Sequence, residues 1–183
     1  LQLVERTGAV WAQGWLCTTL AELHTLLGDW DKAEETLRRG LTIANRIDDG
    51  ALKAMCYHDL GSVALEREDW EAAAGFFGQA IFMARQNSAA RVPHFLMDAA
   101  EARLGIGTLD LALTICKDAM QGAEALSQDG VLGIGYRLRG RALAIRGEYD
   151  ESIGEFQRSL VIFRRLNDRI ESAHTLYYTG QTH

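Results

Sequence analysis

The fold is decided by a short motif that occurs four times along the chain. Its copies are Gly28–Ala33 (GDWDKA), Arg67–Ala73 (REDWEAA), Gly107–Ala112 (GTLDLA) and Gly147–Ser152 (GEYDES). The last residues of these copies stand at positions 33, 73, 112 and 152, so the spacings are 40, 39 and 40 residues. A regular period of this length is typical of a protein built by repeating one supersecondary unit.

A series of small residues runs in the same phase, about twelve residues upstream of each motif. It comprises Ala21, Gly61, Ala100, Gly140 and Gly180, which are spaced by 40, 39, 40 and 40 residues. Apolar residues on both sides of each motif recur every three or four positions, which indicates helices. Each repeat is therefore predicted as two helices joined by a turn. The acidic residue of the motif suits the start of the second helix, where free backbone amides need an acceptor.

These spacings predict a single domain over residues 1–183. The predicted repeats cover residues 9–48, 49–88, 89–128 and 129–168, with a partial repeat at 169–183 and the end of a preceding helix at 1–6. The joint at Asn87–Pro93 differs from the others and uses the only proline. Neither end reads as the polar cap that a stack of repeats needs. We therefore interpret the chain as a piece of a longer solenoid, or as one that buries the surfaces at its ends by forming a homodimer.

The pattern resembles the tetratricopeptide repeat along essentially the whole chain. Repeats of that family have a small residue late in the first helix, an aromatic residue in the turn, and a small residue followed by a large one in the second helix. In this sequence the small slot of the first helix holds Gly61 and Gly140, and the turn holds Trp30, Trp70 and Tyr149. The small slot of the second helix holds Ala33, Ala73 and Ala112, and its large slot holds Leu37, Phe77 and Phe156. Three residues depart from the pattern: Ser152 replaces the alanine of the second helix, Cys116 replaces its large residue, and Leu109 replaces the aromatic residue of the turn. The resemblance implies an all-α fold, a right-handed α-solenoid of antiparallel helix pairs with about 4.5 repeats.

The 40-residue period is longer than that of the standard repeat. The long variant is similar to the repeat tails of bacterial regulators and signalling ATPases, and to animal adaptor proteins with repeats of this length.

Composition narrows the class of protein. Hydrophobic residues make up 48% of the chain and charged residues 24%, which is ordinary for a globular protein and excludes collagen, a disordered tail and a turn-rich β-sandwich. The net charge of −6 argues against nucleic acid as a partner. No apolar run is long enough to span a membrane. Cys17, Cys56 and Cys116 are odd in number and far apart, which favours reduced thiols and a cytoplasmic location.

The sequence contains no convincing catalytic or cofactor-binding constellation. His58 and Asp59 are adjacent, and neighbours in a helix point to different faces. The five histidines lack metal-ligand spacing. Gly130, Gly133 and Gly135 follow no strand, so a nucleotide-binding loop is not indicated. We therefore expect a protein that is not an enzyme and that binds neither a cofactor nor a metal.

The resemblance implies that residues of the first helix of each repeat line a concave groove. The residues assigned to a partner-binding groove on this basis are Trp15, Glu22, Met55, His58, Ser62, Met97, Glu101, Arg137, Arg141 and Tyr177. Such a mixed surface suits a peptide or a partner helix, because methionine adapts its shape and Trp, Tyr and Arg are common hot-spot residues. Arg137 and Arg141 project from one helix face, where two guanidinium groups can bind a carboxylate or phosphate. The alternative is that both arginines pair with Glu101 or with other acids across the groove.

Two functions follow from these observations. The first is a non-catalytic protein–protein interaction module, part of a larger regulatory or scaffold protein, that binds a peptide or helix in its concave groove. The partner is another protein or another domain of the same chain. The alternative is a ligand-sensing or autoinhibitory arm of a bacterial transcription regulator or signalling ATPase, which binds a small molecule or its own chain.

Overall fold

The computed structural model of the protein describes residues 9–182, and every regular element in this range is a helix. The all-α fold class predicted from the sequence is confirmed. The chain divides into two compact units, Leu1–Phe95 and Leu96–His183.

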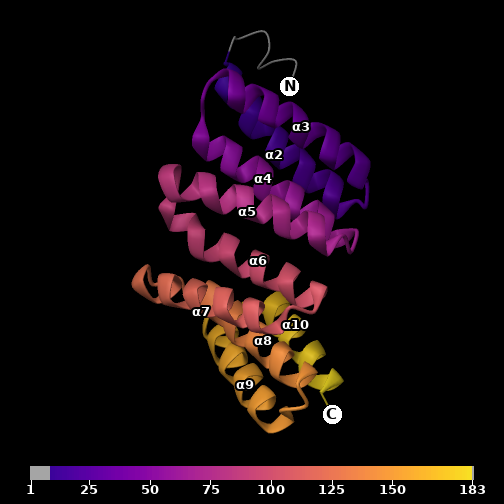
Figure 1. Ribbon diagram of the computed structural model, residues 1–183, viewed down its shortest axis with the longest axis vertical. Coiled ribbons are helices and arrows are strands. Elements are labelled where there is room, and N and C mark those ends of the chain that lie inside the picture. The colour runs from indigo at the N-terminus through magenta and orange to yellow at the C-terminus, as the bar shows by residue number, and fades with distance from the viewer. Residues whose placement is uncertain (1–8, 183) are drawn as a thin grey trace. The chain divides into compact units, whose positions relative to one another are not determined.

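The first unit contains two helix pairs and the start of a further helix. Helix α2 (Val10–Leu26) pairs with α3 (Trp30–Arg46), and α4 (Gly50–Glu66) pairs with α5 (Trp70–Asn87) (Figure 1). Helix α4 also packs against α3 and α2, so that the second pair stacks on the first. A short 3₁₀ turn, η1 (Ala89–Arg91), leads into α6 (Val92–Ile106), which continues into the second unit.

The second unit repeats this arrangement. It contains the rest of α6, then α7 (Leu109–Ala125), α8 (Asp129–Ile145), α9 (Tyr149–Arg165) and α10 (Arg169–Gln181). Helix α8 packs between α7 and α9, and α10 contacts both α9 and α8. The first helix of each repeat is therefore α2, α4, α6, α8 or α10, and the second is α3, α5, α7 or α9.

Seven of the turns that join the helices contain a residue in the left-handed region. Glycine takes this conformation in three turns, at Gly28, Gly107 and Gly147, with φ of 76°, 87° and 79°. Residues with a side chain take it at Asp48, Glu68, Ser127 and Asn167, with φ of 52°, 58°, 53° and 55°. The sequence did not predict these four, because only glycine adopts this conformation without steric cost. The joint before α6 is built differently, around Ser88 and η1.

Acidic side chains cap α4, α5 and α10, and among these caps Asp69 is the one that belongs to the repeated motif. The side chains of Asp49, Asp69 and Asp168 accept hydrogen bonds from the backbone amides three residues later, at 2.9, 3.1 and 3.0 Å. These bonds satisfy amides that a helix leaves free at its start. Asp29 makes no such bond, and its carboxylate accepts one from the ammonium of Lys32 at 2.9 Å instead.

In the second and fourth repeats, the two helices meet where a glycine faces a phenylalanine ring. A Cβ added at Gly61 would lie 2.5 Å from the ring of Phe77, and one at Gly140 would lie 2.7 Å from the ring of Phe156. Both rings are buried, with 0% and 1% of their area exposed. The small and large slots of the sequence pattern therefore interlock, and they set the distance between the paired helices.

Each unit has its own hydrophobic core. In the first unit the slot residues Ala21, Ala33 and Leu37 pack together with Leu60 and Val63. In the second unit the core includes Met97, Ala100, Ala112, Cys116 and Leu138. Cys116 thus fills the large slot of the third repeat, where the other repeats use Leu or Phe.

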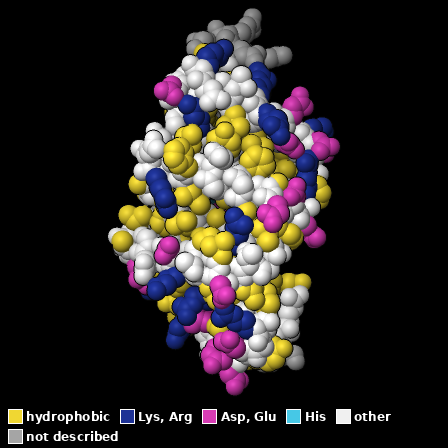
Figure 2. All heavy atoms as spheres, in the orientation of Figure 1, with side chains coloured by type: hydrophobic (Ala, Val, Ile, Leu, Met, Phe, Trp, Pro, Cys, Tyr) yellow, Lys and Arg dark blue, Asp and Glu magenta, His cyan; other side chains and the backbone are white. Residues whose placement is uncertain are grey.

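Charged side chains share the surface with exposed hydrophobic ones (Figure 2). Basic and acidic residues lie next to one another over α7–α9 (Figure 2). Arg146 pairs with Asp110, and Arg165 with Asp129 at 2.7 Å, each 36 positions apart in the sequence. Arg67 makes the equivalent pair with Asp31 in the first unit. No helix within residues 9–182 has the length and apolarity needed to cross a membrane.

The contact between Gly140 and Phe156 predicts an unusual response to alanine. Gly140→Ala should lower the free energy of unfolding by about 1–2 kcal/mol, because overpacking outweighs the helix propensity gained. Urea denaturation measures the change.

Gly154→Ala is the matched control, since Gly154 lies in α9 and a Cβ there would meet nothing within 4 Å. It should raise the free energy of unfolding by up to about 1 kcal/mol. Equal effects of the two substitutions would contradict the close packing at Gly140.

Candidate functional site

The candidate site consists of surface residues on the first helices of the repeats, and each unit carries its own part of it. In the first unit, α2 supplies Trp15 and Glu22, and α4 supplies Met55, His58 and Ser62. In the second unit, α6 supplies Met97 and Glu101, α8 supplies Arg137 and Arg141, and α10 supplies Tyr177.

Aromatic side chains dominate the α2 part of the first unit. Trp15 is half-buried, and its ring centroid lies 6.4 Å from that of Trp11. The indole nitrogen of Trp15 is buried and has no hydrogen-bond partner among the described residues. Glu22 is exposed one helical turn before Leu26, which is also exposed. This part of α2 therefore combines an apolar surface with a carboxylate.

His58 is a packed side chain on α4. Its ring stacks on Phe95 with centroids 4.4 Å apart. Its Nδ1 lies 3.1 Å from a carboxylate oxygen of Asp59, so the expectation that these neighbours point apart is wrong. Ser62 donates a hydrogen bond to the carbonyl of His58 at 3.3 Å, and the sulfur of Met55 lies 3.1 Å from a guanidinium nitrogen of Arg91.

Met97 lies in the core of the second unit rather than on an open face. Only 1% of its area is exposed, and its sulfur is 3.8 Å from the thiol of Cys116. The assignment of Met97 to the groove is therefore corrected. The apolar surroundings that bury it come from α7 and α8, and the spacing along α6 alone does not reveal them.

Arg137 and Arg141 are both ion-paired. Arg137 is 8% exposed, donates to the carboxylate of Glu171 and lies 5.8 Å above the ring of Phe163. Arg141 donates to Glu101 at 2.6 Å, and its guanidinium lies 4.3 Å above the ring of Tyr178. In the structure both arginines pair with acidic side chains, which is the alternative to binding the carboxylate or phosphate of a ligand.

Tyr177 is the most exposed aromatic residue of the candidate site. It is 62% exposed, and its ring meets the edge of Tyr178 at a centroid distance of 5.3 Å. Tyr177, Tyr178 and Arg141 thus form a cluster on α8 and α10, which we call the tyrosine cluster. It presents an aromatic face, two phenol hydroxyls and a guanidinium that is 22% exposed.

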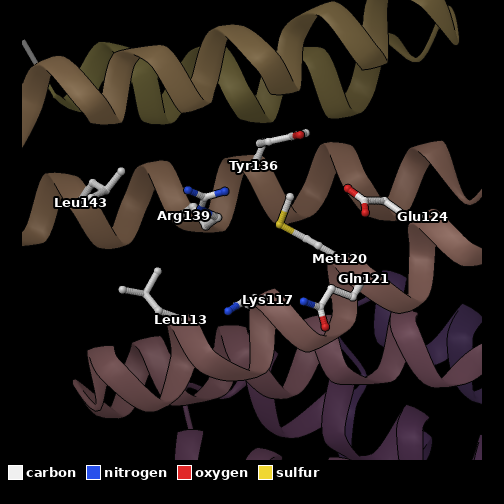
Figure 3. Close-up of a pocket in the computed structure, with 8 residues that line it drawn as sticks. All are labelled: Leu113, Lys117, Met120, Gln121, Glu124, Tyr136, Arg139 and Leu143. Atoms are coloured by element: carbon white, nitrogen blue, oxygen red, sulfur yellow. The ribbon is translucent and has the colours of Figure 1, made fainter.

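A second surface lies on α7 and α8 and was not found from the sequence. It is a groove of about 550 Å³, called here the α7–α8 groove (Figure 3). The residues that line it are Leu113, Lys117, Met120, Gln121, Glu124, Tyr136, Arg139 and Leu143. Those on α7 recur every three or four positions, which is a detectable signal. The gap itself depends on how α7 and α8 pack, and no single helix encodes that.

The three thiols are buried and poorly suited to chemistry. Burial raises the pKa of Cys56 and of Cys116 to about 12, and it also raises the pKa of Cys17. Since the thiolate is the reactive form of cysteine, these groups are protonated and unreactive near neutral pH.

Residues 13–86 match the model of the tetratricopeptide repeat family. The resemblance inferred from the sequence motifs is therefore confirmed. No curated protein matches the sequence.

Solved structures share the fold over nearly the whole chain. The BtubC (BKLC) protein from P. vanneervenii superposes with a TM-score of 0.80 at 19% identity, covering 99% of this chain and 76% of that one. A signal transduction ATPase with a tetratricopeptide repeat sensor from Pyrococcus horikoshii has a TM-score of 0.80 at 14% identity, covering 94% of this chain. A Rap protein complexed with Competence and Sporulation Factor has a TM-score of 0.82 at 14% identity, covering 93% of this chain.

The chain spans 27% of the ATPase and 48% of the Rap protein. At these identities the likeness concerns the fold, and it confirms the solenoid of helix pairs predicted from the repeats.

The pair formed by Arg141 and Glu101 predicts a measurable coupling. A double-mutant cycle of Arg141→Gln and Glu101→Gln should give a coupling free energy of about 1 kcal/mol in urea denaturation, since both side chains are partly shielded from solvent. Additive effects of the two substitutions would show that the pair contributes nothing.

The burial of the thiols predicts slow labelling. Near neutral pH, a thiol-specific disulfide reagent should modify Cys56 and Cys116 only as fast as the protein unfolds, whereas all three thiols should react at once in denaturant. The absorbance of the released thiolate measures both rates. Rapid modification of either residue in the native protein would contradict its raised pKa.

Proposed function

We propose that this chain is a non-catalytic interaction module that binds a peptide or a helix of a protein partner through the first helices of its repeats. The tyrosine cluster is the observation that carries the proposal. An exposed tyrosine beside a second ring and a guanidinium is the composition of an interface hot spot, because aromatic groups bury a large area at small entropic cost.

The state of the arginines shapes the kind of partner proposed. Because Glu171 and Glu101 already pair with Arg137 and Arg141, an acidic ligand must displace an existing carboxylate. Arg141 keeps part of its guanidinium exposed over Tyr178, whereas Arg137 is buried. The proposed contact is therefore mainly apolar and aromatic, with one hydrogen bond or ion pair from Arg141.

The fold supports the same proposal. The Rap protein that shares it was solved in complex with Competence and Sporulation Factor, so this fold can hold a partner. The pairing of Arg146 and Arg165 with acids argues against a nucleic-acid partner, because these arginines have no uncompensated charge to offer to phosphates. A partner supplied by another domain of the same chain, and a homodimer formed through the ends, stay predictions.

A sensor arm is the second candidate function. It is favoured by the α7–α8 groove, whose volume lies within the range of small-molecule sites. The ATPase that shares the fold has a tetratricopeptide repeat sensor.

The tyrosine cluster gives the sharpest test of the interaction module. A library of peptides displayed on phage is selected against the whole chain, and the binders are measured again with Tyr177→Ala. The substitution should weaken the selected peptides by about tenfold or more, because it removes an exposed hot-spot ring without opening the core.

Val161→Ala is the matched control, since Val161 is 67% exposed on α9 and lies outside the candidate site. It should leave binding unchanged. Failure to select any peptide, or equal binding by the wild type and Tyr177→Ala, would overturn the proposal for this surface.

A further inference from the structure

The α7–α8 groove lies on the opposite side of α8 from the two arginines of the candidate site. Arg139 is two residues from Arg137 and from Arg141, and two residues rotate a helix by about 200°. Arg139 therefore faces the groove while its neighbours face away from it. The α7–α8 groove is separate from the tyrosine cluster, and binding there rests on the sensor arm proposed above rather than on the interaction module.

Arg139 is held in place but keeps hydrogen-bonding capacity. Its guanidinium lies 3.5 Å from a carboxylate oxygen of Glu155, and this is an ion pair without hydrogen-bond geometry. Glu155 is 6% exposed, and its other oxygen accepts a hydrogen bond from Arg158 at 2.9 Å. Arginine has five N–H donors in a planar fork, so donors of Arg139 stay available to a ligand in the groove.

Lys117 provides a second cation on the facing wall. It is exposed on α7, and among the described residues its ammonium group has no acidic partner. Figure 3 shows Lys117 and Arg139 on opposite walls of the groove. In a chain of net charge −6, two cations that share one groove form a local site for an anion.

The rest of the groove is divided between an apolar end and an acidic end. Leu113 and Leu143 lie together at one end in Figure 3, and Glu124 and Gln121 lie at the other. Met120 lies between the cations and Glu124 in Figure 3, and Tyr136 lines the groove from α8. A ligand that fits this order has an apolar group, then a carboxylate, then an apolar stretch and finally a cationic or donor group.

The spacing along α7 sets the length of that ligand. Lys117 and Glu124 are seven residues apart on one helix, which places their backbone positions about 10.5 Å apart. An extended chain of three residues spans about 10 Å. A free tripeptide therefore places its terminal carboxylate near the two cations when its terminal ammonium lies near Glu124.

We propose that the α7–α8 groove binds short free peptides of about three residues that end in an apolar residue. Lys117 and Arg139 bind the terminal carboxylate, Leu113 and Leu143 contact the last side chain, and Glu124 binds the terminal ammonium. Because the groove binds both the terminal carboxylate and the terminal ammonium, longer chains and internal peptide segments do not fit.

The test uses the whole chain, the tripeptide Ala-Ala-Leu, and two blocked forms of it, the C-terminal amide and the N-acetyl peptide. Titration calorimetry gives the affinities, and amide chemical shifts locate the site. Ala-Ala-Leu should bind and shift resonances of α7 and α8, and each blocked form should bind about tenfold more weakly, since each loses one charged contact.

Charge variants identify the contacts. Lys117→Gln should weaken the free tripeptide but not its amide, and Glu124→Gln should weaken the free tripeptide but not its N-acetyl form. Both residues are exposed, so neither substitution should change stability by more than about 0.5 kcal/mol. Asp118→Asn is the matched control, because Asp118 is exposed on α7 but does not line the groove, and it should leave the affinity unchanged.

Several results would overturn the proposal. They are no binding of Ala-Ala-Leu at millimolar concentration, equal binding of the free and blocked forms, or shifts confined to helices other than α7 and α8. Equal affinity for 4-methylpentanoic acid, which carries the carboxylate and the apolar group alone, would overturn the role of Glu124. None of these results bears on the tyrosine cluster, whose failure is read from Tyr177→Ala.

Discussion

The fit of a phenylalanine ring against a bare helix backbone is the constraint on which this structure depends. Phe77 and Phe156 occupy space that any side chain at Gly61 or Gly140 would fill. This contact fixes both the distance and the register of the two helices in a pair, because a ring of this size can sit only over the glycine. Once the register is fixed, every other residue of the pair has a defined direction.

Ion pairs join helices within a repeat and helices of neighbouring repeats. Residues 36 positions apart meet in three places, and the acid stands in the first turn of one helix each time while the arginine stands at or near the end of the next. Between the first helices of neighbouring repeats, Glu101 meets Arg141 and Glu171 meets Arg137. Arg137 and Arg141, which the sequence indicated as ligand-binding residues, are therefore ion-paired. Arg139 faces the α7–α8 groove and keeps N–H donors available for a ligand.

Much of the fold could be predicted from the sequence, because its period repeats the same local chemistry. The motif acid Asp69 caps α5, and the small and large slots interlock in the second and fourth repeats. The left-handed turns at Glu68 and Asp48 could not be predicted, since those residue types rarely adopt that conformation. There the helix packing on both sides of the turn imposes a conformation that the residue itself does not favour.

The candidate site was harder to predict than the fold. The resemblance to the tetratricopeptide repeat implied which helix faces carry Trp15, Arg141 and Tyr177, but it did not give the partners of these side chains. Arg137 meets an acid 34 residues away, and Met97 is buried by residues of two later helices. Such contacts depend on side-chain conformations and on the gap between helices, and a one-dimensional pattern contains neither. The α7–α8 groove was missed for the same reason.

Gly180 stands in the same phase as Gly61 and Gly140, yet a Cβ there would meet no other atom within 4 Å. Each joint between a glycine and a ring is complete within one helix pair and draws nothing from its neighbours. The contact of a glycine with a ring is thus a local device of the second and fourth repeats, whereas the first and third repeats pack Ala21 with Leu37 and Ala100 with Cys116.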